Sequence, residues 1–192
     1  MVLVFLAEGF EEIEALTPVD LLRRAGLDVR TAAVGHAPDG CRTVSGSHGI
    51  PVTADALAEE FLDGSSPLEA VILPGGMPGA KNLDADGTVD AILAKAAADP
   101  DCVIAAICAA PMVLGRRGLL DGIRATCFPG FEGELKGAAV LRADTPEGRA
   151  VTDGRFVTAC GMGAATEFAF ALVKILKGED AAEGLRTAVL AK

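Results

Sequence analysis

A single cysteine stands where a predicted strand gives way to a predicted helix. Residues 103–107 form a short apolar run typical of a buried strand, Cys108 follows at once, and a helical pattern begins near Pro111. A residue on so sharp a turn projects its side chain into a crevice, as in a nucleophile elbow, although the GxSxG motif itself is absent. The free amides and the positive dipole end of the helix favour a thiolate, so we predict that Cys108 is a nucleophile.

Glycines at the end of a second predicted strand could assist this thiol. The apolar run 70–73 is closed by the sequence Pro74-Gly75-Gly76. Glycines leave their backbone N–H groups accessible, so Gly75 and Gly76, together with Ala109 after the cysteine, could form an oxyanion hole. Taken alone, the Pro-Gly-Gly sequence is equally consistent with an ordinary turn.

A third predicted strand ends in acidic residues. The apolar run 2–7 is followed by Glu8, Glu11, Glu12 and Glu14. Most of these carboxylates suit a solvated helix start, but Glu14 shares the apolar side of the helix. If it points inward near the cysteine, it has a raised pKa and, when protonated, can donate a hydrogen bond to the thiolate. Because the carboxyl ends of parallel strands meet at one edge of a sheet, all three strand ends are expected to lie together.

The other candidate residues have plainer interpretations. The remaining cysteines are assigned to the common class of small buried hydrophobes, namely Cys41, Cys102, Cys127 and Cys160. The two histidines, His36 and His48, are assigned structural or surface roles, and His48 lies in a predicted hairpin. No cluster of His, Cys and Asp residues indicates a metal site.

The composition bounds the class of protein. The 192 residues suit one domain, 1–192, and 51% of them are apolar, so a sizeable core can form. The net charge of −10 disfavours nucleic-acid binding, and no apolar run approaches the roughly 20 residues that span a bilayer. Five cysteines without a CxxC pair or a regular spacing indicate reduced thiols and therefore a cytoplasmic protein.

Buried strands alternate with helices along the chain. Strands are predicted at 2–7, 29–34, 70–73, 103–107, 138–141, 150–151 and 156–159, with a hairpin in 41–55. Helices are predicted at 10–25, 56–61, 86–98 and 161–178 and at the end of the chain. Pro18 is expected to kink the first helix or divide it into two half-helices. The alternation predicts an α/β fold with a mostly parallel sheet covered on both faces.

Five segments match a known family in order: FLAEGFEEIEALTPVDLLRRAG, VILPGGMPGAKNL, AAICAAPMVL, ATCFPGFE and GAATEFAFALVKIL. Over nearly its whole length the chain resembles the ThiJ/PfpI superfamily, in the branch of the human Parkinson-disease protein deglycase and bacterial YajL. This resemblance implies a flavodoxin-like three-layer sandwich of the class I glutamine amidotransferase-like type, and usually a homodimer. It also implies a strained, reactive Cys108 hydrogen-bonded to a protonated Glu14, with oxyanion amides at Gly76 and Ala109.

Several positions depart from the family pattern. Ala109 stands where PfpI-type proteases carry a catalytic histidine, which argues against a Cys–His protease. Phe128 stands in place of a pocket histidine of the human relative, and His48 in place of an arginine at the dimer interface. His48 and Phe128 are therefore candidate dimer-interface or pocket residues. Because no histidine is evident beside Cys108, general base catalysis is assigned to Glu14 or to the substrate.

Two classes of function fit these residues. The resemblance implies a cofactor-independent glyoxalase III or protein deglycase, a hydro-lyase or hydrolase acting on reactive 2-oxoaldehydes or glycated proteins in carbonyl-stress defence. Cys108 would attack the aldehyde and Glu14 would move a proton between carbons, as in the conversion of methylglyoxal to lactate. The alternative is a non-catalytic redox sensor or stress chaperone with an oxidisable Cys108. Thiazole monophosphate biosynthesis, an older family label, is a lesser alternative because the sequence has no phosphate loop.

Overall fold

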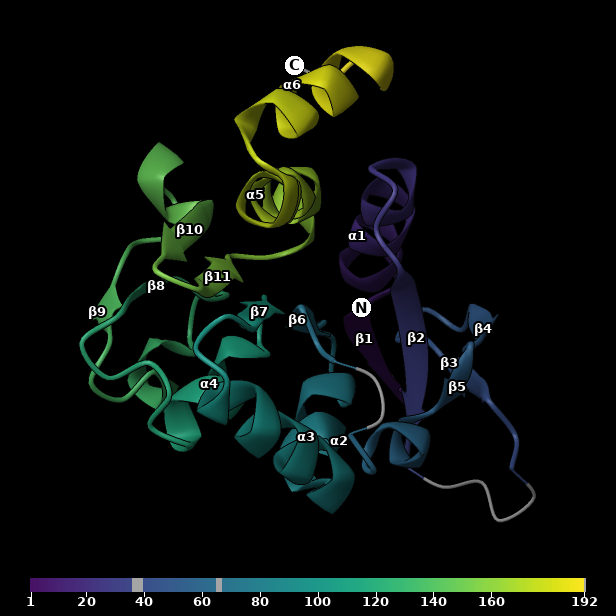
Figure 1. Ribbon diagram of the computed structural model, residues 1–192. Helices are drawn as coiled ribbons and strands as arrows, with labels where there is room; N and C mark the ends of the chain where they lie inside the picture. Colours follow the sequence, from purple (N-terminus) through teal and green to yellow (C-terminus); the bar gives the residue numbers. More distant parts are fainter. Residues whose placement is uncertain (36–39, 65–66, 192) are drawn as a thin grey trace.

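A seven-stranded sheet forms the centre of the computed structural model, which describes residues 1–35, 40–64 and 67–191 (Figure 1). Its strands are β1 Val2–Ala7, β2 Val29–Val34, β5 Ala56–Leu57, β6 Ala70–Leu73, β7 Val103–Ile107, β10 Ala150–Asp153 and β11 Phe156–Ala159. They lie in the order β10-β11-β7-β6-β1-β2-β5. The edge strand β10 runs antiparallel to β11, and the other neighbouring strands run parallel. The carboxyl ends of β1, β6 and β7 therefore lie at one edge, as predicted.

Helices cover both faces of this sheet (Figure 1). The helices are α1 Glu12–Arg24, α2 Gly79–Ala85, α3 Gly87–Ala98, α4 Pro111–Arg116, α5 Ala165–Lys177 and α6 Glu179–Ala188. On one face, Val2 and Val4 of β1 share a core with α1 and α5, and α6 packs on α5. On the other face, Leu3 and Phe5 share a core with α2, α3 and α4. The chain forms the predicted three-layer α/β sandwich.

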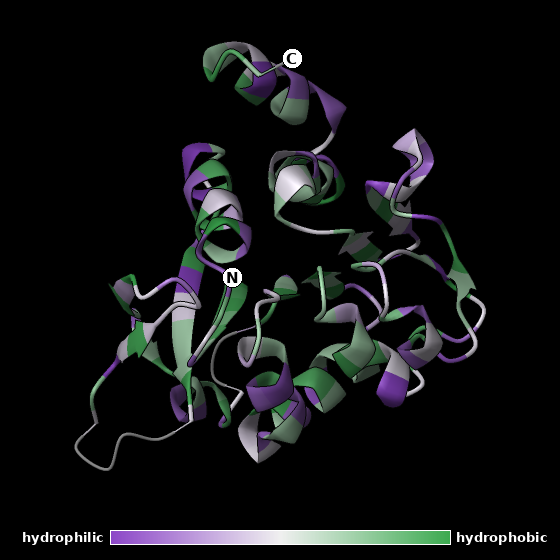
Figure 2. Cartoon of the chain, turned by 180° about the vertical axis from the view of Figure 1, so that it is seen from behind, coloured by the Kyte–Doolittle hydropathy of each residue, from purple (hydrophilic) through white to green (hydrophobic). Residues whose placement is uncertain are grey.

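The distribution of hydrophobic residues follows these layers. Figure 2 shows the strands mostly in hydrophobic colours, whereas the helices alternate between hydrophobic and hydrophilic residues. Strands buried on both faces need continuous apolar runs, and helices with one buried face need only an apolar stripe. The strands β1, β6 and β7 are buried along their whole length.

Helix α1 begins at Glu12 because the preceding residue caps it. The Oε1 atom of Glu11 accepts a hydrogen bond from the N–H of Ile13 at 3.3 Å. Pro18 lies inside this helix, which continues to Arg24, so the predicted division into two half-helices is wrong. Packing of α1 against α5 and the sheet outweighs the one hydrogen bond that proline removes.

Several short elements differ from the sequence-based expectation. Residues 56–61 form strand β5 and a 3₁₀ helix, Ala58–Phe61, instead of one helix. Helix α2 forms in a stretch rich in Gly and Pro, where no helix was expected, because Gly79 lets its start pack directly against the loop after β1. A two-residue strand β8, Arg124–Ala125, pairs with β9, Ala139–Val140, although only the second was expected.

Other expectations for the loops and cysteines have mixed outcomes. The predicted hairpin forms from β3, Thr43–Ser45, and β4, Pro51–Thr53, which pair in antiparallel register. Cys102 and Cys127 are buried as predicted, whereas Cys160 is partly exposed and Cys41 is exposed. His36 lies outside the described residues. In the described part of the chain, no helix is both long and apolar enough to cross a membrane.

A glycine inside α4 provides a test of this packing. A Cβ atom on Gly115 would overlap the carbonyl oxygen of Glu134 and lie 2.7 Å from the Cα of Leu135. We therefore expect Gly115→Ala to lower the free energy of unfolding by about 1–3 kcal/mol, because neither backbone can yield freely. Urea denaturation at constant m-value measures this change.

Gly184→Ala in α6 is the matched control. A Cβ atom there meets nothing within 4 Å, so the better helix propensity of alanine should raise the free energy of unfolding by roughly 0.5–1 kcal/mol. Equal urea midpoints for the two variants would contradict the packing described for α4.

Candidate active site

Cys108 lies directly after β7 in an unusual backbone conformation. Its φ angle is 64°, in the left-handed region that residues other than glycine rarely adopt. Such a conformation costs on the order of 1–3 kcal/mol and persists only where neighbouring contacts fix it. Here the N–H of Cys108 donates to the carbonyl of Ala159 at 2.8 Å, and its own carbonyl accepts from the N–H of Phe128 at 2.8 Å. The elbow is held from two sides, and the cysteine remains partly exposed.

Glu14 reaches the same crevice from the first turn of α1. The residue is almost completely buried, with 1% of its surface exposed. Its Oε2 atom accepts a hydrogen bond from the N–H of Gly75 at 3.0 Å, and its side chain also hydrogen-bonds the Cys108 thiol and the N–H of Met162. Helix α1, the turn after β6 and the elbow after β7 therefore meet at one pair of acids.

Burial controls the ionisation of both acids. It raises the pKa of Glu14 to about 7; the hydrogen bond with Cys108 opposes this rise and the charge of Glu11 adds to it. Burial, and next the charge of Glu14, raise the pKa of Cys108 to about 12, whereas the N–H groups of Ala109 and Gly76 lower it. Negative charge on either acid disfavours charge on the other, so the pair holds one negative charge over a wide pH range.

The amides predicted to bind an oxyanion have different partners. The N–H of Gly75 is engaged by Glu14, so this amide is not available to a ligand. The N–H groups of Gly76 and Ala109 instead point to the sulfur of Cys108. Close packing requires the glycines: a Cβ atom on Gly75 would lie 2.5 Å from Oε2 of Glu14, and one on Gly76, whose φ is 88°, would overlap the backbone of the loop after β1.

A pocket of about 400 Å³ opens over the thiol. Besides Cys108, its wall includes an acidic and polar group, Glu11, Glu14, Ser47 and His48, and an apolar group, Met77, Phe128, Phe131 and Met162. Three of the apolar side chains are strongly exposed, Met77, Phe128 and Met162. The pocket suits a small molecule with an apolar part and a few polar atoms. His48 and Phe128, the two candidate pocket residues, both line it.

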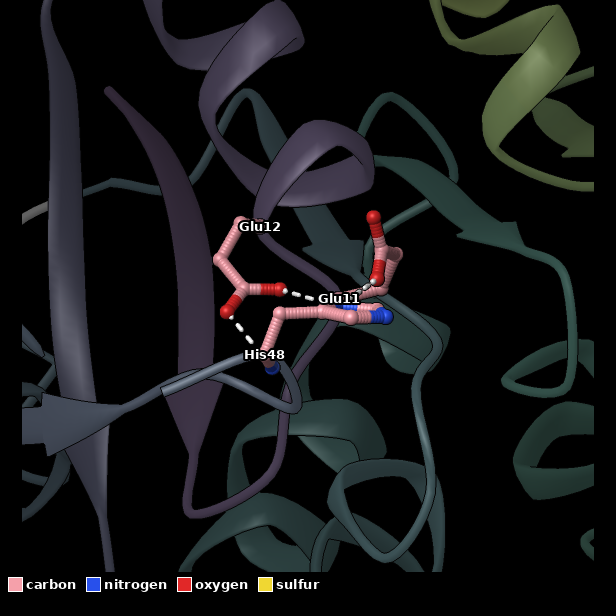
Figure 3. A group of neighbouring side chains, drawn as sticks. All are labelled: Glu11, Glu12 and His48. Carbon is pink, nitrogen blue, oxygen red and sulfur yellow. Dashed lines mark hydrogen bonds and ion pairs between the residues drawn. The ribbon is translucent and has the colours of Figure 1, made fainter. Parts of the chain in front are cut away.

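His48 and Glu11 of this wall form a network with Glu12, which lies outside the pocket lining (Figure 3). The Nδ1 atom of His48 lies 3.1 Å from Oε2 of Glu12 and 3.2 Å from Oε2 of Glu11. The backbone N–H of His48 donates to Oε1 of Glu12 at 2.8 Å. The hydroxyl of Ser47 donates to Glu11 at 3.1 Å and to Glu12 at 3.3 Å. Figure 3 shows the imidazole between the two carboxylates, with its second nitrogen pointing away from Glu12.

The network favours the charged forms of Glu12 and His48. Burial opposes ionisation of Glu12, but hydrogen bonds from its own N–H, from His48 and from the N–H of Ile50 hold its pKa at about 2. The hydrogen bond to Glu12, followed by the charges of Glu11 and Glu12, raises the pKa of His48 above its usual value of 6.5. His48, a candidate pocket or dimer-interface residue from the sequence, therefore lines the Cys108 pocket, and its pairing with Glu11 and Glu12 is what sequence reasoning did not find.

The same network is the group of described residues whose geometry could hold a metal ion. Glu11, Glu12 and His48 present ligand atoms within 4.8 Å of one another, a donor set that borderline divalent metals accept. No metal site was expected from the sequence. Because both carboxylates already accept hydrogen bonds from Ser47 and from backbone N–H groups, they need no cation to satisfy them.

Long-range packing explains which pocket residues the sequence misses. Sequence reasoning assigns Glu11 to a solvated helix start and does not single out Ser47 or Met77. In the structure, the N–H of Ser47 donates to the carbonyl of Phe10 at 2.7 Å, which fixes the β3–β4 turn against the start of α1. The Ser-Gly-Ser sequence is the local signal for this segment. It predicts a turn, but it does not predict that the turn packs against the start of α1.

Residues 1–175 match the model of the DJ-1/PfpI family. The chain belongs to this family. The match covers the sheet, the cysteine elbow and the pocket described above. It confirms the ThiJ/PfpI resemblance drawn from the motifs and agrees with the flavodoxin-like arrangement of the sheet and helices.

Several curated DJ-1 relatives are similar over most of the chain. Protein DJ-1 homolog B of Arabidopsis thaliana is 35% identical over 94% of the chain, and the Parkinson disease protein 7 homolog of Danio rerio is 34% identical over 99% of the chain and 96% of the relative. A deglycase of Pyrococcus abyssi is 28% identical over 92% of the chain and 99% of the relative. The chain spans less than half the length of the Arabidopsis homologs, 39% of homolog B and 46% of homolog A.

Solved DJ-1 structures superpose closely on the fold. A DJ-1 superfamily protein from Salmonella typhimurium gives a TM-score of 0.88 at 34% identity, over 100% of this chain and 98% of that one. Oxidized DJ-1 of Toxoplasma gondii gives a TM-score of 0.86 at 35% identity, over 98% and 97% of the two chains. The likeness extends through the whole sandwich.

Proposed function

We propose that this protein converts small 2-oxoaldehydes to 2-hydroxy acids by covalent catalysis at Cys108, in the manner of a glyoxalase III or deglycase active in carbonyl-stress defence. The observation that carries the proposal is the strained elbow itself, in which two amides and one buried carboxyl surround a thiol that opens on a small pocket. The deglycase of Pyrococcus abyssi among the relatives supports it. We propose that residues 1–192 form a single domain that carries this activity.

Taken singly, a pKa of about 7 for Glu14 and about 12 for Cys108 would place the first charge on the carboxyl, whereas the proposed reaction requires the shared negative charge on sulfur. Two observations favour this placement over a charge on Glu14. Glu14 is almost completely buried, whereas Cys108 is partly exposed and better hydrated. The carboxylate of Glu11 raises the pKa of Glu14, which disfavours charge on Glu14. A neutral Glu14 removes the second cause of the raised thiol pKa and leaves the amides of Gly76 and Ala109 to stabilise a thiolate.

The chemistry then follows in balanced steps. The Cys108 thiolate attacks the aldehyde carbon, and the resulting alkoxide takes the proton of Glu14 to give a hemithioacetal. The Glu14 carboxylate removes the hydrogen from this carbon and returns it to the neighbouring carbon, which converts the adduct to a thioester of the 2-hydroxy acid. Water, deprotonated by Glu14, hydrolyses the thioester, and the sulfur leaves as a thiolate. The net reaction of methylglyoxal and water gives lactate and one proton.

A second candidate function uses the same thiol as a redox sensor. A partly exposed sulfur with amide donors around it is suited to stabilise sulfenic and sulfinic acids. The oxidized DJ-1 of Toxoplasma gondii among the similar structures supports this alternative. In that case the protein would act as a sensor or stress chaperone without turnover.

Lactate formation from methylglyoxal tests the proposal. Wild type should produce lactate, Cys108→Ser should abolish it, and Glu14→Gln should lower kcat by about 10²- to 10⁴-fold because proton transfer between carbons is lost. Cys41→Ser, at an exposed cysteine outside the pocket, is the matched control and should keep wild-type activity. Absence of lactate from wild type, together with ready addition of two oxygens to Cys108 by peroxide, would favour the sensor instead.

We also propose that two copies associate through an apolar groove beside the site. The groove is lined by Ile13, Leu16, Leu21 and Ile50, and the residues Ile13 and Ile50 are 46% and 53% exposed. Glu12 belongs both to this groove and to the histidine network, so the interface would adjoin the pocket.

Light scattering coupled to size exclusion tests this association. We expect a dimer for wild type and a monomer for Ile13→Glu, because a carboxylate in the apolar groove would be buried without a partner. A wild-type monomer at micromolar concentration would refute the homodimer.

A further inference from the structure

We infer that His48 is the proton carrier between the two neighbouring oxygens of the substrate in the Cys108 pocket, a role that rests on the proposed function. In that reaction a hydrogen moves from one carbon to the next, and the two oxygens must exchange protons as well. Glu14 is occupied with the carbon-bound hydrogen. The remaining titratable groups of the pocket are Glu11 and His48, and the orientation of the imidazole decides between them.

The imidazole of His48 is oriented by its carboxylate partners. Its Nδ1 atom lies within 3.1–3.2 Å of Glu12 and Glu11, which fixes a proton on Nδ1. No described residue hydrogen-bonds Nε2, and Figure 3 shows this nitrogen pointing away from Glu12. A carboxylate on one nitrogen and a free second nitrogen is the arrangement in which histidine exchanges protons with a ligand. Glu11, in contrast, already accepts hydrogen bonds from Ser47 and Ile13.

The position of the β3–β4 turn fixes this orientation. The backbone N–H of His48 donates to Oε1 of Glu12 at 2.8 Å, so side chain and main chain hold the same carboxylate. Gly46 permits the close approach, because a Cβ atom there would overlap the Glu12 side chain. The turn therefore presents the imidazole to the pocket from a rigid support.

The proton movements balance when His48 serves both oxygens. While Glu14 takes the hydrogen from the sulfur-bearing carbon, Nε2–H of the imidazolium gives its proton to the ketone oxygen, and an enediol forms with a neutral imidazole. Glu14 then returns its proton to the second carbon. The hydroxyl on the sulfur-bearing carbon loses its proton to Nε2, which restores the imidazolium and leaves the thioester. The two oxygens of a cis-enediol are close enough for one nitrogen to reach both.

The charges around His48 favour its imidazolium form over the neutral imidazole. The charged groups of the described chain that face it are Glu11 and Glu12, and the Glu14–Cys108 pair lies in the same pocket. All of these are acids, so the pocket suits an uncharged dicarbonyl better than a carboxylate or phosphate ester. The substrate class that follows is small neutral 2-oxoaldehydes.

The test compares His48→Gln and Glu12→Gln with wild type in two assays. The first is kcat for methylglyoxal as a function of pH, and the second is alkylation of Cys108 by iodoacetamide, which needs no proton donor. His48→Gln should lower kcat by about 10²-fold or more while the alkylation rate stays within about twofold. Thr53→Ser, at an exposed position on the same hairpin, should match wild type in both assays.

The pH profile separates proton transfer from mere support of the fold. In wild type, kcat should fall as pH rises through the raised pKa of His48, because the imidazolium proton is lost. Glu12→Gln removes the main cause of that rise and should move the alkaline limb of the profile to lower pH. His48→Gln should have no such limb in its residual activity.

Each failure has a distinct signature. Turnover by wild type with an unchanged kcat in His48→Gln, or with an alkaline limb that Glu12→Gln does not move, overturns the role of His48 and leaves the proposed function intact. Equal losses of turnover and alkylation in His48→Gln also overturn it, since the residue then only supports the thiol. Absence of turnover in wild type overturns the proposed function, and the role of His48 with it.

Discussion

Two acids in contact inside one crevice can hold a single negative charge between them, and this constraint organises the site. Glu14 and Cys108 are hydrogen-bonded, and burial raises the pKa of each. Charging one acid makes charging the other more difficult. The chemistry of the pocket therefore depends on which atom carries the charge, and the surrounding groups determine this: Glu11 beside the carboxyl, and the amides of Gly76 and Ala109 beside the sulfur.

The fold supplies this contact by bringing three strand ends to one edge of a parallel sheet. Helix α1 follows β1 and carries Glu14 inward, the glycine turn follows β6, and the strained elbow follows β7. Hydrogen bonds to Ala159 and Phe128 hold the left-handed backbone at Cys108 from both sides. The interdependence is tight, since a Cβ atom on Gly75 would meet both Glu14 and the cysteine. Small changes at any of the three strand ends should therefore be transmitted to the thiol.

Local sequence patterns predict this part of the site well. Apolar runs locate the strands, parallel topology gathers their ends, and the placement of Glu14 on the apolar side of α1 gives its burial. Such patterns do not predict helix α2, because this helix forms where glycine allows close packing and not where helix propensity is high. At Pro18 the local pattern predicts an interruption of the helix, but tertiary packing maintains one continuous helix through this residue.

The contact between His48 and Glu12 cannot be predicted from local sequence patterns. It depends on contacts of the β3–β4 turn with the loop after β1, and these join residues more than thirty positions apart. Sequence alone gives His48 as a hairpin residue and a candidate pocket or dimer-interface residue, and Glu12 as a solvated acid, whereas the structure joins the two into one network beside the Cys108 pocket. Pairs of this kind are visible only once the chain is folded.

The most direct test of the account measures where the shared charge resides. The ultraviolet absorbance of the Cys108 thiolate, taken as the difference between wild type and Cys108→Ser, can be followed as pH is raised. A charge on sulfur predicts that the absorbance appears with the first ionisation of the pair, at or below a pH of about 7. If it appears only near pH 12, Glu14 carries the charge at neutral pH, and Cys108 is not the nucleophile described here.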